Sequence, residues 1–310
     1  MTATAPIEPN DIAGLAPDEV KTETFVPTPV GKKRAGFPVY LTVWLLVVIW
    51  TIPTLGLLVN SFRAPADIRR TGWWKAIGRP FDTAQWTFDN YTRVLDEGFS
   101  NAFLNTLAVA IPSTIIPIMI AAFAAYAFAW MDFPFRNFLF IVVVGLMVVP
   151  LQMALIPILR VYTDLDLTGT YPAVWLAHAG FGLPLAVYLL RNYMGSLPGS
   201  MIESARIDGA DHFSIFTKLV LPLSVPVLAS FAIFQFLWTW NDYLVALVFL
   251  GIDPDKRVLT VELADLAGRG EGALNLLPAA AFVTMILPLV VFFGLQRFFV
   301  RGLTAGSVKG

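Results

Sequence analysis

The residues best able to do chemistry lie in two stretches of the chain, and the first surrounds an acid within an apolar run. Asp242 is the only acidic residue between positions 219 and 252. A charge inside a membrane is costly enough to mark a candidate functional residue by default. Three aromatic residues near Asp242 could stack on a sugar ring: Trp238, Trp240 and Tyr243. The Asn241 amide could form hydrogen bonds with the hydroxyl groups of the sugar. We predict a solute pathway here; alternatively, the rings form an interfacial belt, with Asp242 reaching the interface or paired with a partner subunit.

Three other polar residues interrupt apolar runs: Asn105, Gln152 and His178. Their simplest role is hydrogen bonding between neighbouring helices. Contact with a transported solute is the alternative, and Gln152 is included among the candidates for the pathway. The residue types do not indicate a metal site, because the chain has no cysteine and its two histidines lie far apart in sequence.

The second stretch, residues 203–230, reads ESARIDGADHFSIFTKLVLPLSVPVLAS and is polar before it becomes apolar. Its pattern predicts a short helix over 197–207, capped by Ser196 or Ser200 and ended by Gly209, which accepts a left-handed conformation. Asp211 can then cap a second helix, on which apolar residues recur with helical spacing: Phe213, Phe216 and Val220.

This predicted helical hairpin carries more apolar surface than an isolated surface loop needs: Ile202, Ile207, Phe213 and Phe216. One interpretation is that these side chains fill a groove on a partner protein. The other is that they pack under the chain's own helix ends. The residue types alone leave both interpretations open.

The elements that carry these residues must be membrane helices. The chain is 57% hydrophobic and 14% charged, with a mean hydropathy of +0.69, and a bilayer core of about 30 Å needs roughly 20 apolar residues in a helix. Six runs satisfy that length: 38–60, 101–131, 137–159, 170–190, 219–241 continuing past Asp242 to 250, and 272–296. None alternates as a membrane strand does. The predicted fold class is therefore an all-α membrane protein with six transmembrane helices.

The ends of the chain predict its domains and its orientation. Residues 1–36 combine five prolines with acids and threonines, which predicts a disordered tail rather than a secretory signal. We therefore expect a cytoplasmic tail (1–36), a transmembrane domain (37–300) and a second cytoplasmic tail (301–310). Six spans place both termini on one face, and basic residues beside the first and last spans predict that this face is cytoplasmic: Lys32, Lys33, Arg34, Arg297, Arg301 and Lys309. The segment 61–100 would lie outside, although it is rich in both basic and acidic residues.

The second stretch also carries a spaced motif: Glu203, Ser204 and Ala205, then Gly209, then Leu219, Leu221 and Pro222. It resembles the "EAA" signature of permease subunits of bacterial ATP-binding-cassette importers, E-[AS]-A-x3-G-x9-[IL]-x-L-P. Three further segments look like the carbohydrate, maltose-type branch: VVPLQMALIPIL (148–159), LDLTGTYPAV (165–174) and FLWTWNDYL (236–244). The resemblance covers about residues 38–300, with a family core at about 100–300. Ser204 in place of alanine and Leu219 in place of isoleucine are its departures.

The resemblance implies a cytoplasmic coupling loop at 195–222, between the fourth and fifth helices, that docks into an ATPase subunit. The docking residues would be Glu203, Ser204, Ala205, Asp208, Gly209, Phe213, Phe216 and Pro222. It also implies a second permease subunit, two ATPase subunits and an extracytoplasmic sugar-binding protein, in the bacterial inner membrane. The chain itself would be non-catalytic and hold no cofactor, and the ATPase subunits would bind ATP and Mg.

Other functions have less support from the residues. The only Gly-Lys pair, Gly31-Lys32, lacks the remainder of a phosphate-binding loop, and a net charge of −1 without a basic stripe does not indicate nucleic acid as a partner. A membrane-embedded enzyme would need a nucleophile–base or metal constellation that the sequence does not suggest. An autonomous secondary transporter of a polar solute is the main alternative, with Asp242 as the candidate for ion coupling.

Overall fold

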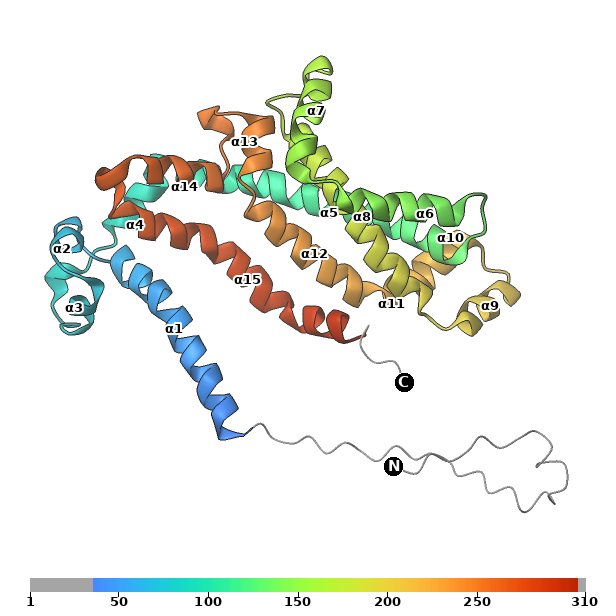
Figure 1. Ribbon diagram of the computed structural model, residues 1–310, viewed down its shortest axis with the longest axis horizontal. Helices are drawn as coiled ribbons and strands as arrows, with labels where there is room; N and C mark the ends of the chain where they lie inside the picture. The colour runs from blue at the N-terminus through green and yellow to red at the C-terminus, as the bar shows by residue number, and fades with distance from the viewer. Residues whose placement is uncertain (1–35, 306–310) are drawn as a thin grey trace, which may run out of the picture. The chain divides into compact units, whose positions relative to one another are not determined.

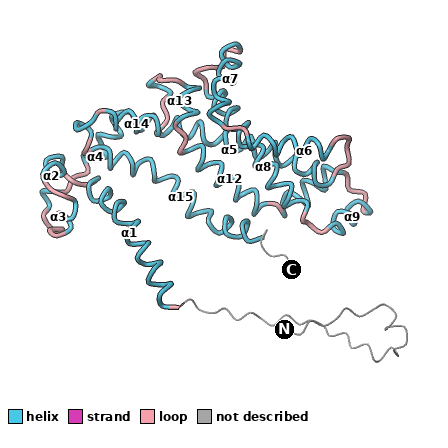
Figure 2. The backbone as a smooth tube through the Cα atoms, viewed as in Figure 1, coloured by secondary structure: helices cyan, strands magenta, loops and turns pink. Residues whose placement is uncertain are grey.

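The structure is a computed structural model that describes the backbone of residues 36–305 and the side chains of residues 36–296. This part of the chain is almost entirely helical and contains no strand, only an isolated bridge between Arg63 and Trp86 (Figure 2). The chain divides into two units between Thr51 and Ile52, within the first helix. The predicted tail at residues 1–36 lies outside the described residues except for Gly36, whereas the last helix continues to Ala305.

The longer elements are α1 (Phe37–Ser61), α5 (Ser100–Trp130), α6 (Arg136–Gly145), α7 (Leu151–Asp164), α8 (Tyr171–Gly195), α12 (Val225–Trp240), α14 (Leu259–Gly268) and α15 (Leu276–Ala305). The shorter ones are α2 (Pro65–Arg70), α3 (Trp73–Ile77), α4 (Asp89–Val94), α9 (Gly199–Ile207), α10 (His212–Ile215), α11 (Leu221–Leu223) and α13 (Leu244–Leu250). Four helices among the described residues are long and apolar enough to cross a membrane, and six spans result if each of two bent pairs counts as one.

The third predicted span is strongly bent. The segment from α6 through Val148 meets α7 at an angle of 104°. Pro150 precedes α7, and a proline restricts the residue before it to extended conformations. Val149 accordingly has a φ of −69° and a ψ of 117°, which ends the preceding helical turn.

The fifth predicted span differs from expectation in two places. Its two parts, His212–Leu223 and Val225–Trp240, meet at 70°, with Pro226 in the first turn of α12. The prediction of one helix continuing past Asp242 to Leu250 is wrong, because α12 ends at Trp240 and α13 begins at Leu244. The backbone N–H groups of Val245 and Ala246 bond the Asp242 side chain, so the acid starts a new helix rather than lying in the middle of one.

Four helices build the core. Helix α5 packs along α8, and α12 packs against both α5 and α15 (Figure 1). Small side chains dominate the buried faces of α5 and α8, including Ala110, Ala121, Ala125, Ala173 and Ala186. Small residues let membrane helices approach closely, which replaces the hydrophobic driving force that lipid does not supply.

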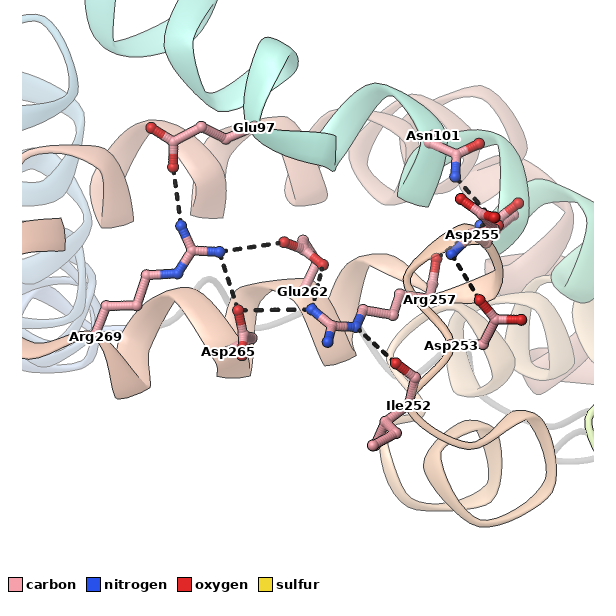
Figure 3. Close-up of polar contacts among 10 residues, drawn as sticks. Glu97, Asn101, Ile252, Asp253, Asp255, Arg257, Glu262, Asp265 and Arg269 are labelled. Carbon is pink, nitrogen blue, oxygen red and sulfur yellow. Dashed lines mark hydrogen bonds and ion pairs between the residues drawn. The ribbon is translucent and has the colours of Figure 1, made fainter.

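An ionic cluster joins α14 to the segment that leads into α5. Arg269 pairs with Glu97 at 3.0 Å and with Asp265 at 3.0 Å, while Arg257 pairs with Glu262 at 3.4 Å (Figure 3). The hydrogen bond to Asp265 raises the pKa of Arg269 further, so this side chain stays charged. The cluster stabilises the end of α5 at residue 100, whereas the polar hairpin lies at the other end, beside Trp130.

Candidate functional site

The hairpin formed by α9, α10 and α11 (residues 199–223, hereafter the α9–α11 hairpin) has the predicted turn. Gly209 has a φ of 81°, and no atom lies within 4 Å of where its Cβ would stand, so backbone conformation is the reason for glycine here. Asp211 accepts a hydrogen bond from the Ser214 backbone N–H at 2.8 Å, and the bonding to Ser214 lowers the pKa of the Asp211 carboxyl. The predicted serine cap of the first helix is wrong. Pro198 precedes α9 without a side-chain cap, and the Ser196 hydroxyl donates to the Tyr193 carbonyl oxygen.

The apolar residues of this hairpin divide between two faces. Ile202 is 2% exposed and Phe216 is 3% exposed, both within the core cluster that joins α5 and α8. Ile207 is 86% exposed and Phe213 is 65% exposed. The sequence left two interpretations open, and each holds for one pair. Ile202 and Phe216 pack under the chain's own helices, whereas Ile207 and Phe213 are not covered by any described residue.

Polar contacts attach the hairpin to the ends of α5 and α8. The Tyr126 hydroxyl lies 3.0 Å from Nδ1 of His212, and Arg206 donates to the Trp130 carbonyl oxygen at 3.1 Å. The Trp130 indole in turn donates to the Met194 carbonyl oxygen in α8 at 3.0 Å. The hairpin is therefore attached to α5 directly and to α8 through Trp130.

The polar motif residues lie on the outer side of the hairpin, whereas Ala205, Leu219 and Leu221 are half-buried against the core. Glu203, Ser204 and Asp208 are exposed, and Glu203 forms no ion pair with a described residue. A groove of about 920 Å³ separates α9 from α10, and Ser204, Ala205, Asp208 and Gly209 are among the residues that line it. Pro222 lies in α11, at the start of the path into α12.

A second hollow, of about 650 Å³, lies between the bend of α6 and α7, helix α8 and Trp238 of α12. Its walls are apolar and aromatic and contain no charged side chain: Leu146, Met147, Val149, Leu151, Pro157, Ile158, Val161, Tyr162, Leu176, Ala177, Gly180, Phe181, Pro184 and Trp238. We call it the α7–α8 cavity. Aromatic faces with little charge suit the apolar face of a neutral ring-shaped solute.

Asp242 lies beside this cavity, not in it. Its carboxylate accepts hydrogen bonds from the backbone N–H groups of Val245, at 3.3 Å, and Ala246, at 2.9 Å. It also lies 3.6 Å from Nε2 of His178, a fully buried residue whose ring meets Trp238 edge-on at 5.2 Å. Asp242 thus fixes the first turn of α13 and faces the histidine that supports the cavity wall.

The structure separates the other pathway candidates. Trp240 is fully buried and donates to the Thr284 carbonyl oxygen, so it packs in the core. Asn241 bonds the Leu237 carbonyl oxygen of its own helix, and Tyr243 is 42% exposed. Gln152 is exposed on α7 and is not among the residues that line the cavity. Of the set, Trp238 alone lines it.

Two buried polar residues, Asn105 and Gln235, form hydrogen bonds between segments of the core. Asn105 accepts a hydrogen bond from the Tyr171 hydroxyl of α8 at 2.8 Å, which confirms the predicted bonding between neighbouring helices, and it donates to the carbonyl oxygens of Asp255 and Arg257. Gln235, which sequence reasoning missed, is fully buried and donates to the His178 carbonyl oxygen at 3.3 Å. A glutamine inside a long apolar run was the available signal. Its amide fits against Gly182, where any Cβ would lie within 2.5 Å of it.

Comparison with known proteins identifies the family. A family model described as "Binding-protein-dependent transport system inner membrane component" matches residues 117–305, more than half of the chain. The chain belongs to this family. It therefore belongs with the inner-membrane permeases, whose model covers α5 from Pro117 onward, the other core helices, the α9–α11 hairpin and the α7–α8 cavity.

Two curated relatives in this permease family match nearly the whole length. The osmoprotective compounds uptake permease protein GgtD of Synechocystis sp. is 56% identical over 273 residues, covering 88% of this chain and 92% of the relative. The alpha-glucoside transport system permease protein AglG of Rhizobium meliloti is 45% identical, covering 88% and 97%.

Among solved structures, a bacterial ABC transporter that imports the acidic polysaccharide alginate contains a chain with the same fold. The TM-score is 0.64 at 21% identity, covering 86% of this chain and 98% of that one. A second structure shows the bacterial alginate transporter in complex with alginate pentasaccharide-bound periplasmic protein, with a TM-score of 0.58 at 15% identity.

Proposed function

We propose that this chain is one transmembrane permease subunit of an ATP-driven, binding-protein-dependent importer of sugars. The observation that carries the proposal is the α9–α11 hairpin, which is fastened to α5 and α8 through one face and leaves Ile207 and Phe213 exposed on the other. A surface of this kind fits the helix-in-groove mode of recognition. Permease relatives named for sugar uptake support the same function.

The partner for the exposed face is a cytosolic ATPase subunit. Two such subunits would bind ATP and Mg and dock on the coupling hairpins of this chain and of a second permease. Glu203, exposed and without an ion partner among the described residues, is placed to meet a basic group on the ATPase. The chain then has no catalytic role, and it converts ATPase movement into displacement of α5 and α8.

The same assembly gives the chain an orientation. Each of the two bent pairs, α6 with α7 and α10 to α11 with α12, counts as one span, which gives six transmembrane segments and both termini in the cytoplasm. The hairpin then lies on the cytoplasmic side, and the end near residue 100 receives solute from an extracytoplasmic binding protein. The alginate transporter that contains a chain of the same fold has been solved in complex with a periplasmic protein.

The solute class is a neutral sugar, such as a di- or oligosaccharide or a small glucoside. Among the described residues, no charged side chain lines the α7–α8 cavity, whereas a carrier of acidic sugars needs cations along its path. The name of one relative, an alpha-glucoside permease, agrees with a sugar cargo. Trp238 is the residue through which this subunit contacts the sugar ring.

Docking is tested by comparing two phenylalanines of the hairpin. Phe213→Ala removes an exposed ring, so we expect ATPase association to weaken by about tenfold, equivalent to about 1.4 kcal/mol, with unchanged thermal stability. Phe216→Ala is the matched control because it opens a buried cavity, costing about 3–5 kcal/mol of stability. ATPase retention on the purified complex and sugar uptake in proteoliposomes are the measurements. Normal ATPase retention by Phe213→Ala would exclude the docking face, and full transport without any ATPase subunit would favour a secondary transporter.

The sugar contact is tested at the cavity. Trp238→Ala is expected to raise the KM for uptake several-fold, since one stacking contact contributes about 1 kcal/mol, and to leave sugar-independent ATPase activity in place. Trp240→Phe, a conservative change in the core, serves as the control and should leave the KM unchanged. An unchanged KM for Trp238→Ala across a panel of neutral sugars would remove Trp238 from the pathway.

A further inference from the structure

The segment between α1 and α4 (residues 62–88, hereafter the interfacial hairpin) lies at the end of the molecule opposite to the α9–α11 hairpin. It contains α2, α3 and a short 3-10 turn at 83–85. A fully buried arginine holds it together: Arg63 donates to Asn60, to Asp67 and to both the carbonyl and the hydroxyl oxygen of Thr71. Asn90 bonds the carbonyl oxygens of Ser61 and Arg63, which fixes the hairpin to α4.

This hairpin follows the C-terminal end of α1 (Figure 1) and approaches its last turns. The indole nitrogen of Trp73 lies only 2.7 Å from the position that a Cβ on Gly56 would occupy, so Gly56 makes room for the ring. Gly56 precedes the end of α1 at Ser61 by five residues, or about 7.5 Å at a rise of 1.5 Å per residue. The 25 residues of α1 are about 37 Å long. If α1 is centred in a hydrocarbon core about 30 Å thick, each end of the helix therefore extends beyond the core by about 4 Å. Trp73 is thus at the depth of the membrane interface.

The hairpin exposes large apolar side chains. Trp74 is 64% exposed, Ile77 is 52% exposed and Phe81 is 94% exposed. The neighbouring part of α1 has exposed leucines as well, with Leu55 at 43% and Leu57 at 46%. The apolar surface of the membrane span therefore continues onto the hairpin.

Cations accompany these apolar side chains: Arg69, Arg70, Lys75 and Arg79 are exposed, and none forms an ion pair with a described residue. Two acids of the hairpin, Asp67 and Asp82, leave it with an excess of positive charge even when Arg63 is set aside. Tryptophan and phenylalanine at the acyl boundary with lysine and arginine at the phosphate level are the composition of a segment that lies in the plane of a membrane.

We propose that the interfacial hairpin is a membrane anchor that inserts Trp74, Ile77 and Phe81 into the lipid leaflet opposite to the α9–α11 hairpin, with Lys75 and Arg79 binding lipid phosphate groups. The anchor fixes the height of the start of α5, because Asn90 joins the hairpin to α4, which leads through residues 95–99 into that helix. The proposal does not depend on the transported solute.

The chain has no cysteine, so a single introduced cysteine gives a unique labelling position within it. The Phe81→Cys variant is labelled with an environment-sensitive fluorophore in the assembled transporter, whose partner subunits have their cysteines replaced. The labelled complex is placed in nanodiscs of mixed phosphatidylcholine and phosphatidylglycerol, without a binding protein. Leu57→Cys on α1 is the lipid reference, and Asp255→Cys, exposed on the same side, is the aqueous reference.

We expect phospholipids with a doxyl group near the headgroup to quench the fluorescence of the Phe81 label as strongly as that of the Leu57 label. Aqueous iodide should quench the Phe81 label at least about threefold less than the Asp255 label, as for a segment buried about 5–10 Å into the interface. Strong iodide quenching equal to that at Asp255 would overturn the proposal, because the hairpin would then stand in water. Quenching by neither agent would also overturn it, because a partner subunit would cover the hairpin.

Discussion

The turn at Gly209–Asp211 and the break at Asn241–Tyr243 use the same device in opposite surroundings. In each, an aspartate carboxylate accepts backbone N–H groups at the start of a new helix, from Ser214 in the first and from Val245 and Ala246 in the second. Asp211 is exposed, whereas the side chain of Asp242 is 11% exposed and faces the buried His178. Water can replace a lost cap at the first site but not at the second.

The backbone also differs between the two sites. The exterior turn reverses the chain through a left-handed glycine at φ 81°, whereas Asn241 at the interior break has an ordinary φ of −89°. The first turn therefore depends on a residue type, and the second depends on a buried polar contact. Mutations should accordingly affect coupling at the first site and assembly at the second.

The largest expected effect is that of Gly209→Pro. Proline fixes φ near −65° and has no N–H, so it cannot adopt the observed conformation or keep the bond to the Arg206 carbonyl oxygen. Distortion of about 3 kcal/mol should lower sugar uptake by more than about tenfold while the helices still insert. Gly209→Asn is the control, because asparagine tolerates the left-handed region and its Cβ meets no atom within 4 Å. Wild-type uptake by the proline variant would show that the turn has no part in coupling.

Asp242→Ala should act on stability before it acts on sugar preference. It removes two hydrogen bonds to a charged acceptor and leaves His178 without its neighbour, a loss of about 3 kcal/mol. The yield and thermal stability of the complex should fall, with Asp242→Asn intermediate because its amide oxygen can still accept one bond. A variant with normal stability and altered sugar preference would instead make Asp242 a solute ligand.

The contrast between these two sites explains how much the sequence could predict. Gly209 and Asp211 have local signatures, so the hairpin was predicted from residue types, and the membrane helices followed from run length. The break after Trp240 was missed because hydropathy does not distinguish a continuous helix from two short ones. The burial of Trp240 could not be predicted either, because it depends on α15, which lies in a distant segment of the sequence.

A smaller effect is expected from Glu203→Lys. The side chain is exposed and has no ion partner among the described residues, so its replacement should leave thermal stability unchanged. Charge reversal at a docking surface mainly slows association and alters its dependence on salt. The ATPase should bind several-fold more slowly at low ionic strength, with Glu203→Gln intermediate. Stopped-flow association measured at two salt concentrations tests this, and a rate independent of the charge at position 203 would place the residue outside the interface.

The smallest effect concerns the exterior cap. Because bonding to Ser214 lowers the pKa of Asp211 in the folded chain, the cap's contribution is present above the ordinary pKa and is lost as the pH falls through the lowered one. The protection of the Ser214 amide against hydrogen exchange, relative to its intrinsic rate, should therefore be constant near neutrality and decline only below about pH 4. Asp211→Asn keeps an oxygen that can accept the bond but cannot titrate over this range, so its protection should not change with pH. The Val245 and Ala246 amides provide the internal comparison at the buried cap. If protection at Ser214 declines equally in both proteins, acid acts elsewhere in the hairpin, and the titration of Asp211 does not control the cap.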